Sequence, residues 1–224
     1  MRYRALLMDF YGTLVEEDDA IIDRIVETIV DRSPVPVDRR RVLASWRFGE
    51  LCARSHGAAF RTQRALELES LQHLLREFGV DLDAESLSAE LFRYWVAPAP
   101  YPSSARLLES MSVPVCLVSN IDSSDLAAAV GRLGWRFDHV VTSEDCRAYK
   151  PRPEPFQAAL DVLGLRARDV LHVGDSLSSD VAGARALGID CVWVNRRNRV
   201  LPPDFASRPT CEVSDVGEVV GLLR

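Results

Sequence analysis

Arg4-Ala-Leu-Leu-Met-Asp-Phe-Tyr-Gly-Thr-Leu14 is a stretch near the N-terminus in which an apolar run ends abruptly at Asp9. Four consecutive apolar residues, Ala5 to Met8, are typical of a short strand that is buried on both faces. The Asp9 carboxylate then lies at the C-terminal edge of the strand, where an open parallel sheet binds its ligands. An Asp at this place is also a common turn former, so the rest of the chain has to decide between the two interpretations.

The size and charge of the chain limit the classes of protein to which it can belong. Its 224 residues, 47% of them hydrophobic, are enough for one sizeable core with a smaller appended unit. The formal net charge of -6 argues against a nucleic-acid partner, because such proteins concentrate positive charge. No apolar run approaches the roughly 18 residues of a membrane helix, and no signal peptide precedes the first strand. We therefore expect no membrane association, a cytoplasmic location and a small-molecule substrate.

The segment after the first strand is predicted to be entirely helical. An acidic stretch from Glu16 to Asp19 leads into apolar residues that recur with helical spacing. The segments with this spacing are roughly 21–30, 38–55, 60–78 and 84–96. Pro98, Pro100 and Pro102 then form a stiff connector of the composition expected at a domain boundary.

The remainder of the chain alternates between helical patterns and short apolar runs. The runs are at 113–119, 137–143, 170–174 and 191–195, and helices are predicted near 103–111, 123–133, 154–163, 179–187 and 215–224. This alternation implies right-handed crossovers and a mostly parallel sheet. The sequence therefore predicts an α/β fold with a Rossmann-like three-layer core. We expect residues 1–14 and 100–224 to form this core and residues 15–99 to form an inserted all-helical cap.

Further polar residues occur where apolar runs end. Ser119 closes one predicted strand, Asp175 closes another, and Asp180 follows in the first helical turn, where the helix dipole favours a negative charge. With Asp9 they place three carboxylates at one edge of the sheet. Like charges at close range either take up protons or bind a cation, and hard oxygen ligands suit Mg2+. Lys150, the only lysine in the chain, can neutralise such a cluster.

Four short motifs occur in a fixed order along the chain. They are Asp9-Phe-Tyr-Gly-Thr-Leu14, Ser119-Asn120, Lys150-Pro151, and Gly174-Asp175-Ser176 followed by Asp180. In this order and spacing they resemble the haloacid dehalogenase superfamily of hydrolases, in particular members with a helical cap after the first strand. The resemblance extends over nearly the whole chain and implies an enzyme that acts on a small anionic metabolite.

The resemblance also implies roles for individual residues. Asp9 would be a nucleophile that forms a covalent aspartyl intermediate. The implied catalytic residues are Asp9, Thr13, Ser119 and Lys150. The implied ligands of Mg2+ are Asp9, the Tyr11 backbone carbonyl and Asp175. Asp180 would either bind the ion directly or support its other ligands. Substrate contacts are expected from Tyr11, Gly12, Asn120 and the cap residue Arg47.

One position departs from the phosphatases of this superfamily. They usually carry a second Asp two residues after the nucleophile, to protonate the leaving oxygen, and this chain has Tyr11 there. A phenol with a pKa near 10 is a poor proton donor at neutral pH, and losing a general acid typically costs about 100- to 10,000-fold in rate. Tyr11 and the pair Trp46-Arg47 are similar to the 2-haloacid dehalogenases, whose halide needs no proton. Those enzymes, however, carry Ser and Asn where this chain has Asp175 and Leu177.

Because Asp175 is retained, the leading expectation is a Mg2+-dependent phosphatase that uses an aspartyl-phosphate and acts on a small phosphorylated metabolite. Two alternatives stay open. One is a metal-free 2-haloacid dehalogenase, and the other is a catalytically degenerate member of the superfamily that binds a metabolite or a partner.

Overall fold

The computed structural model describes residues 2–222, and a six-stranded parallel sheet lies at its centre. The strands are β1 (Ala5–Met8), β2 (Val115–Ser119), β3 (His139–Thr142), β4 (Val170–Gly174), β5 (Asp190–Val194) and β6 (Cys211–Val213). Their order is β3-β2-β1-β4-β5-β6, and every neighbouring pair is parallel. The chain starts in the middle of the sheet and builds outward on both sides of β1. The direction of winding therefore reverses next to β1, and such a reversal opens a crevice at the carboxyl ends of the strands.

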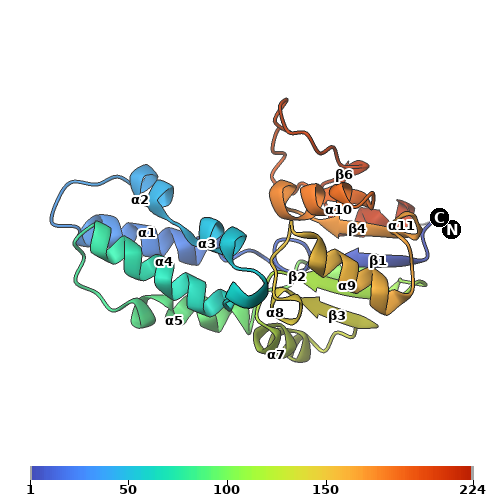
Figure 1. Cartoon of the computed structure of the whole chain (residues 1–224), viewed down its shortest axis with the longest axis horizontal. Helices are drawn as coiled ribbons and strands as arrows, with labels where there is room; N and C mark the ends of the chain where they lie inside the picture. Colours follow the sequence, from blue (N-terminus) through green and yellow to red (C-terminus); the bar gives the residue numbers. More distant parts are fainter. Residues whose placement is uncertain (1, 223–224) are drawn as a thin grey trace.

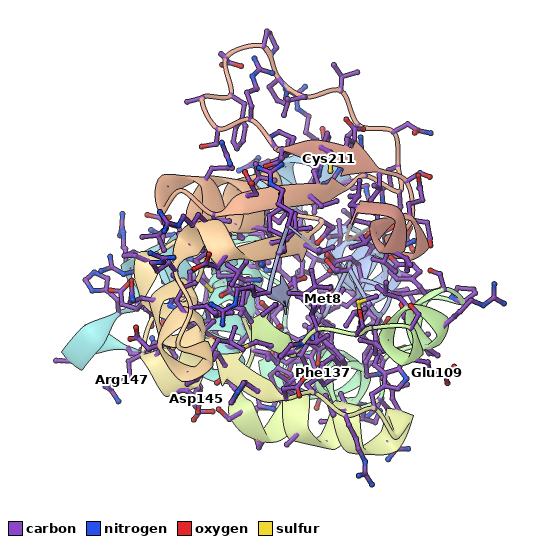
Figure 2. All side chains as sticks on the ribbon, turned by 90° about the vertical axis from the view of Figure 1, so that its right-hand side faces the viewer. Met8, Glu109, Phe137, Asp145, Arg147 and Cys211 are labelled. Atoms are coloured by element: carbon purple, nitrogen blue, oxygen red, sulfur yellow. The ribbon has the colours of Figure 1, made fainter. Side chains whose placement is uncertain are left out.

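Helices cover both faces of the sheet (Figure 1). They are α6 (Ser104–Glu109), α7 (Ser123–Leu133), α8 (Ser143–Cys146), α9 (Pro153–Leu163), α10 (Ala182–Ala186) and α11 (Val219–Leu222). In β1, Leu6 and Met8 pack with residues of α6, α7 and α11, whereas Ala5 and Leu7 pack with residues of α9 and α10. Figure 2 shows Met8 in the middle of these packed side chains, with Cys211 of β6 at one edge. The three-layer α/β fold predicted from the sequence is confirmed.

Five further helices lie between β1 and α6 in the sequence and beside the sheet in space (Figure 1). They are α1 (Asp19–Arg32), α2 (Arg39–Ser45), α3 (Phe48–Arg54), α4 (Gln63–Glu77) and α5 (Ala84–Trp95). Their apolar faces bury Ile25, Ile29, Leu71, Leu74 and Leu91, which belong to the same hydrophobic cluster as Leu6 and Met8 of the sheet. No helix in the part of the chain described combines the length and the apolar character needed to cross a bilayer.

The two segments that connect the cap helices to the sheet run side by side. Val15 and Pro100 form an antiparallel bridge, the amide of Glu16 donates to the carbonyl of Ala99 at 2.8 Å, and the amide of Tyr101 donates to Leu14 at 3.1 Å. We propose that the division between core and cap lies here, at the predicted residues 14 and 100. Because the two connecting segments are paired, the chain enters and leaves the cap at the same place.

A pair of core carboxylates joins the cap to the sheet. The Asp122 carboxylate accepts the backbone amides of Gln63 at 2.6 Å and Arg64 at 3.1 Å, at the N-terminus of α4. Asp125 accepts two hydrogen bonds from the Arg64 guanidinium, at 2.7 and 2.8 Å. The positive end of the helix dipole favours this position for an acid. These contacts hold α4 against the core beside the carboxyl ends of the strands.

Some predicted elements were wrong in detail. The single helix expected over 38–55 is broken at Trp46, whose backbone is extended (φ -73, ψ 106) and whose ring packs against the cap core. Tertiary packing has overridden helix propensity there. The expected helix at 179–187 begins instead as a π turn at Leu177–Val181.

β6 was not predicted, because a three-residue edge strand with one buried residue carries little periodicity. The last predicted helix, 215–224, is a 3-10 turn at Val216–Glu218 followed by α11, and residues 223–224 lie outside the part described.

Candidate active site

A cavity of about 680 Å3 lies between the carboxyl ends of the central strands and the cap. Its core side includes Asp9 after β1, Ser119 at the end of β2, and Lys150. Its cap side includes Phe48, Gly49, Cys52 and Ala53 of α3. Three of the four predicted catalytic residues therefore come from separate strands and loops to one cavity, because parallel strands present their carboxyl ends at the same edge. The fourth, Thr13, does not line the cavity but contacts Asp9.

Lys150 is the centre of the charged network. Its Nζ donates to Asp9 Oδ1 at 2.6 Å, to Asp180 Oδ1 at 2.7 Å and to the carbonyl of Val118 at 2.8 Å. The residue is only 4% exposed. Burial opposes the charge, but the charges of Asp180 and Asp9 outweigh it and raise the pKa of Lys150 above its usual range. A lysine ammonium has three N–H groups, so these three acceptors use all of them.

Asp9 keeps one oxygen for other contacts. Oδ1 is held by Lys150, whereas within residues 2–222 Oδ2 accepts only the Thr13 hydroxyl, at 3.2 Å. Burial raises the pKa of Asp9, and the charge of the Lys150 ammonium opposes this shift. The contact with that ammonium at 2.6 Å favours the carboxylate form. The weakly bonded Oδ2 is the oxygen with electron density available for a reaction.

Asp180 orients Lys150 from the other side. Its Oδ1 bonds to Nε2 of the buried His172 at 2.9 Å, and its Oδ2 accepts the amide of Ser176 at 3.0 Å. Burial opposes the charge, but Lys150 and His172 hold the pKa of Asp180 well below its usual range. A Cβ at Gly174 would lie 2.3 Å from Cγ of Asp180, so a glycine is needed where the two approach. Asp180 is therefore a fixed negative charge beside Lys150.

Asp175 lines the same cavity, with its carboxyl close to Gly12. A Cβ at Gly12 would lie 2.7 Å from Oδ1 of Asp175 and 2.4 Å from Oε1 of Glu17, so both carboxyls lie over Gly12. Burial and the charge of Glu17 raise the pKa of Asp175 to about 9. Burial, with Asp18 and Asp9, raises the pKa of Glu17 to about 7. Glu17 belongs to the acidic stretch that precedes the first cap helix, and it lines the cavity.

Three carboxylates could together hold a metal ion. Asp9, Asp175 and Asp180 each offer an oxygen within 4.8 Å of the others, and a set of carboxylate oxygens suits Mg2+. Oδ1 of Asp9 and Oδ1 of Asp180 also accept hydrogen bonds from Lys150. The donor set fits Mg2+, and binding of Mg2+ by Asp9, Tyr11, Asp175 and Asp180 stays a prediction.

Tyr11 is not placed to donate a proton to a leaving group. Its hydroxyl donates to the backbone carbonyl of Trp95 at 2.5 Å. Burial, with Asp125 and Asp18, raises the pKa of Tyr11 above its usual range. The Tyr11 side chain lines the cavity, and its hydroxyl is bonded to the cap.

The expected substrate contacts differ in where they lie. Asn120 lines the cavity, but its side chain bonds to the backbone of Lys150 at 2.7 and 3.1 Å and so holds the lysine loop. Gly12, at φ +78, lines a smaller neighbouring cavity of about 190 Å3. Arg47 does not line the main cavity. Its side chain is 46% exposed and lies 3.4 Å from Glu50.

Ser119 and Arg152 are two of the polar residues of the cavity that can donate to an anion. Ser119 is 2% exposed, lines the cavity, and its hydroxyl makes no hydrogen bond within residues 2–222. Arg152 also lines the cavity, and its guanidinium is held by Glu154 at 2.7 and 3.1 Å. Arg152 was not among the site residues predicted from the sequence. Its position two residues after Lys150 was the available signal.

Comparisons with known proteins agree on one group of enzymes. A family model described as haloacid dehalogenase-like hydrolase matches residues 3–188. The (S)-2-haloacid dehalogenase of Pseudomonas sp. (strain YL) is 28% identical over 228 residues, which cover 98% of this chain and 94% of the relative. (S)-2-haloacid dehalogenase H-109 of Pseudomonas putida is 26% identical, over 97% of this chain and 96% of the relative. The crystal structure of a dehalogenase has a TM-score of 0.76 and 26% identity, and covers 98% of this chain and 96% of that chain.

These similarities contradict the expectation of a Mg2+-dependent phosphatase. The first relatives are 2-haloacid dehalogenases, in keeping with the alternative interpretation of the sequence. The error came from the weight given to Asp175. Its presence was interpreted as evidence for a bound Mg2+ and hence for a phosphatase.

Proposed function

Because the chain belongs to the haloacid dehalogenase-like hydrolases, we propose that it is a 2-haloacid dehalogenase that replaces the halogen of a small 2-halocarboxylate with a hydroxyl group. The observation that carries this proposal is that the two carboxylate oxygens of Asp9 have different hydrogen-bond partners. One carboxylate oxygen is fixed by Lys150 at 2.6 Å, and the other has only the longer contact with Thr13.

The first half of the reaction needs a nucleophile and no acid. Oδ2 of Asp9 attacks C2 of the substrate, a C–O bond forms, the C–halogen bond breaks, and the halide leaves with the electron pair. A halide is stable as an anion, so no proton donor is required beside it. This suits a site in which the Tyr11 hydroxyl is bonded to Trp95. The product of this half is an ester between Asp9 and the substrate carbon.

The second half regenerates Asp9. Water attacks Cγ of the ester, the bond between Cγ and the ester oxygen breaks, and the departing oxygen takes one proton to become the hydroxyl of the product. The second proton of the water leaves to solvent. The overall change is halocarboxylate plus water to hydroxycarboxylate, halide and a proton. Lys150 stabilises the negative charge on Oδ1 in the tetrahedral intermediate.

The substrate carboxylate needs its own partners. Lys150 has no N–H left for it, because Asp9, Asp180 and Val118 take all three. We assign the carboxylate to Ser119 and Arg152, since both line the cavity and can donate. Arg47 would have to leave Glu50 and move toward the cavity to take the role expected of it.

Halide release from each enantiomer of 2-chloropropionate tests the proposal. The wild type should release chloride, and Asp9→Asn should release none, because an amide oxygen is a weak nucleophile. Asp31→Asn, an exposed change on α1, is the matched control. In a single turnover in water labelled with oxygen-18, the heavy isotope should enter the Asp9 side chain, as read by peptide mass. Wild-type rates in Asp9→Asn, or no halide release from a folded wild type, would contradict the proposal.

A further inference from the structure

We propose that the substrate carries an extended hydrocarbon chain on C2, and that this chain lies against the cavity face of α3. The inference rests on the proposed function and names its substrate class. It concerns 2-halocarboxylates with an unbranched alkyl group of several carbons rather than haloacetate or halopropionate.

The cavity is larger than the reacting groups need. Pockets of roughly 300–1,000 Å3 enclose drug-sized ligands, and this one measures about 680 Å3. A halogen, a carboxylate and the two carbons that carry them occupy only the part beside Asp9, Ser119 and Arg152. The rest of the volume extends toward the cap, where α3 lines it.

The two ends of the cavity differ in chemistry. The core end contains the ion pairs of Lys150 with Asp9 and Asp180. The α3 end is lined by Phe48, Gly49, Cys52 and Ala53, which bear no charge. A ligand with an anionic head and an apolar tail matches both ends. A short haloacid, or a ligand with a second polar group in place of the tail, would leave the residues of α3 in contact with water.

The cavity face of α3 is only partly covered by the protein itself, because Phe48 and Cys52 are half-buried and Gly49 and Ala53 are exposed. The helix has seven residues and none of them is buried, unlike α1, α4 and α5 around it. Its four lining residues fall at positions i, i+1, i+4 and i+5, which share one side of a helix. Burying apolar surface is favourable, so this face is stabilised when a hydrocarbon chain covers it. The site of the nucleophile opens directly onto it.

Gly49 lies on the cavity face of α3, and because it has no side chain it leaves space there. A Cβ built at Gly49 would meet no atom within 4 Å. A leucine there therefore has room in the cavity and also favours a helix over glycine. Gly131 of α7 is the matched position, because it is exposed, it lies within a helix, and its Cβ would also meet nothing within 4 Å.

The test compares bromide release from 2-bromohexanoate and 2-bromopropionate. Each methylene that leaves water contributes about 0.8 kcal/mol, or about fourfold in a rate constant. The three extra methylenes should raise kcat/KM of the wild type at least about tenfold, since burial need not be complete. Gly49→Leu should lower the ratio of the two kcat/KM values at least about tenfold, and Gly131→Leu should leave the ratio unchanged.

The outcomes separate this inference from the function on which it rests. Bromide release from 2-bromopropionate without a preference for the longer compound, or an unchanged ratio in Gly49→Leu, would overturn the inference alone. No release from either compound by the folded wild type would overturn the proposed function as well. Calorimetric binding of hexanoate and propionate repeats the comparison without turnover. The wild type should bind hexanoate more tightly, and Gly49→Leu should lose that difference.

Discussion

Nζ of Lys150 lies 2.6 Å from Oδ1 of Asp9, and the same nitrogen bonds to Asp180 and Val118. The lysine is therefore saturated by the protein before any substrate arrives. It acts on the substrate only through Asp9, by fixing one oxygen of the carboxylate and leaving the other to react. Both residues are buried, so this ion pair is part of the fold as well as of the site.

Replacing Lys150 with methionine should lower both activity and stability. Asp9 and Asp180 would be left buried without their cation, and removing one partner of a buried ion pair typically costs about 3–5 kcal/mol. Loss of the charge that stabilises the tetrahedral intermediate should lower kcat by about 100- to 1,000-fold. Urea unfolding and halide release measure the two effects. A free energy of unfolding within about 1 kcal/mol of the wild type would show that the pair contributes little.

Tyr11→Phe separates the phenol ring from its hydroxyl. The variant removes the hydrogen bond to the Trp95 carbonyl, so the free energy of unfolding should fall by about 0.5–1.5 kcal/mol. Because the hydroxyl faces the cap backbone, kcat for halide release should stay close to that of the wild type. A fall of about 100-fold, the size expected for a lost proton donor, would place the hydroxyl in the reaction.

Removal of divalent cations should leave halide release unchanged. The proposed steps use Asp9, Lys150 and water, and none of them needs an ion at Asp175. Chloride release after treatment with EDTA should equal the untreated rate, and added Mg2+ should not increase it. If EDTA abolished release and Mg2+ restored it, the carboxylates of Asp9, Asp175 and Asp180 would have to hold a catalytic ion.

Glu67 in the cap should make stability fall as the pH rises. Burial, with the charge of Asp18, raises its pKa from 4.5 to about 8, and its Oε1 has no hydrogen-bond partner within residues 2–222. Between these values the unfolded chain gives up the proton and the folded chain keeps it. The free energy of unfolding should therefore fall by up to about 1.4 kcal/mol per pH unit from this group.

Glu67→Gln removes this titration. The variant should match the wild type near pH 4.5 and be more stable near pH 8, by a few kcal/mol at most, when urea unfolding is followed at both values. Glu27→Gln, on the exposed face of α1, is the control. Equal stability of Glu67→Gln and wild type at both pH values would show that Glu67 ionises freely in the fold.

The sequence predicted those parts of the molecule that local pattern determines. An apolar run that ends at a polar residue is a local signal, and it located Asp9, Ser119 and Asp175 at one edge of the sheet. The side on which a residue lies in a short cap helix is not local. Arg47 starts α3 and points to Glu50 because the chain breaks at Trp46, whose ring packs against the cap core.

Contacts between segments that are far apart in the sequence could not be predicted either. Asp122 directly precedes α7, yet its carboxylate caps α4, and no spacing in the chain links it to Gln63. The direction of Asp175 also depends on Glu17 and Gly12, which belong to another loop. The choice of phosphatase over dehalogenase was made on the presence of Asp175 in the motif, and the similarity to 2-haloacid dehalogenases contradicts it.

The chain has one lysine, and it is 4% exposed. An amine-directed reagent therefore meets no lysine on the surface, and modification of residue 150 requires its amine to leave Asp9, Asp180 and Val118. The rate of labelling at this position reports how readily these bonds break, with no reporter group added. A ligand that fills the cavity should slow the labelling in proportion to its occupancy, so the enzyme can serve as its own probe for compounds that it binds without converting.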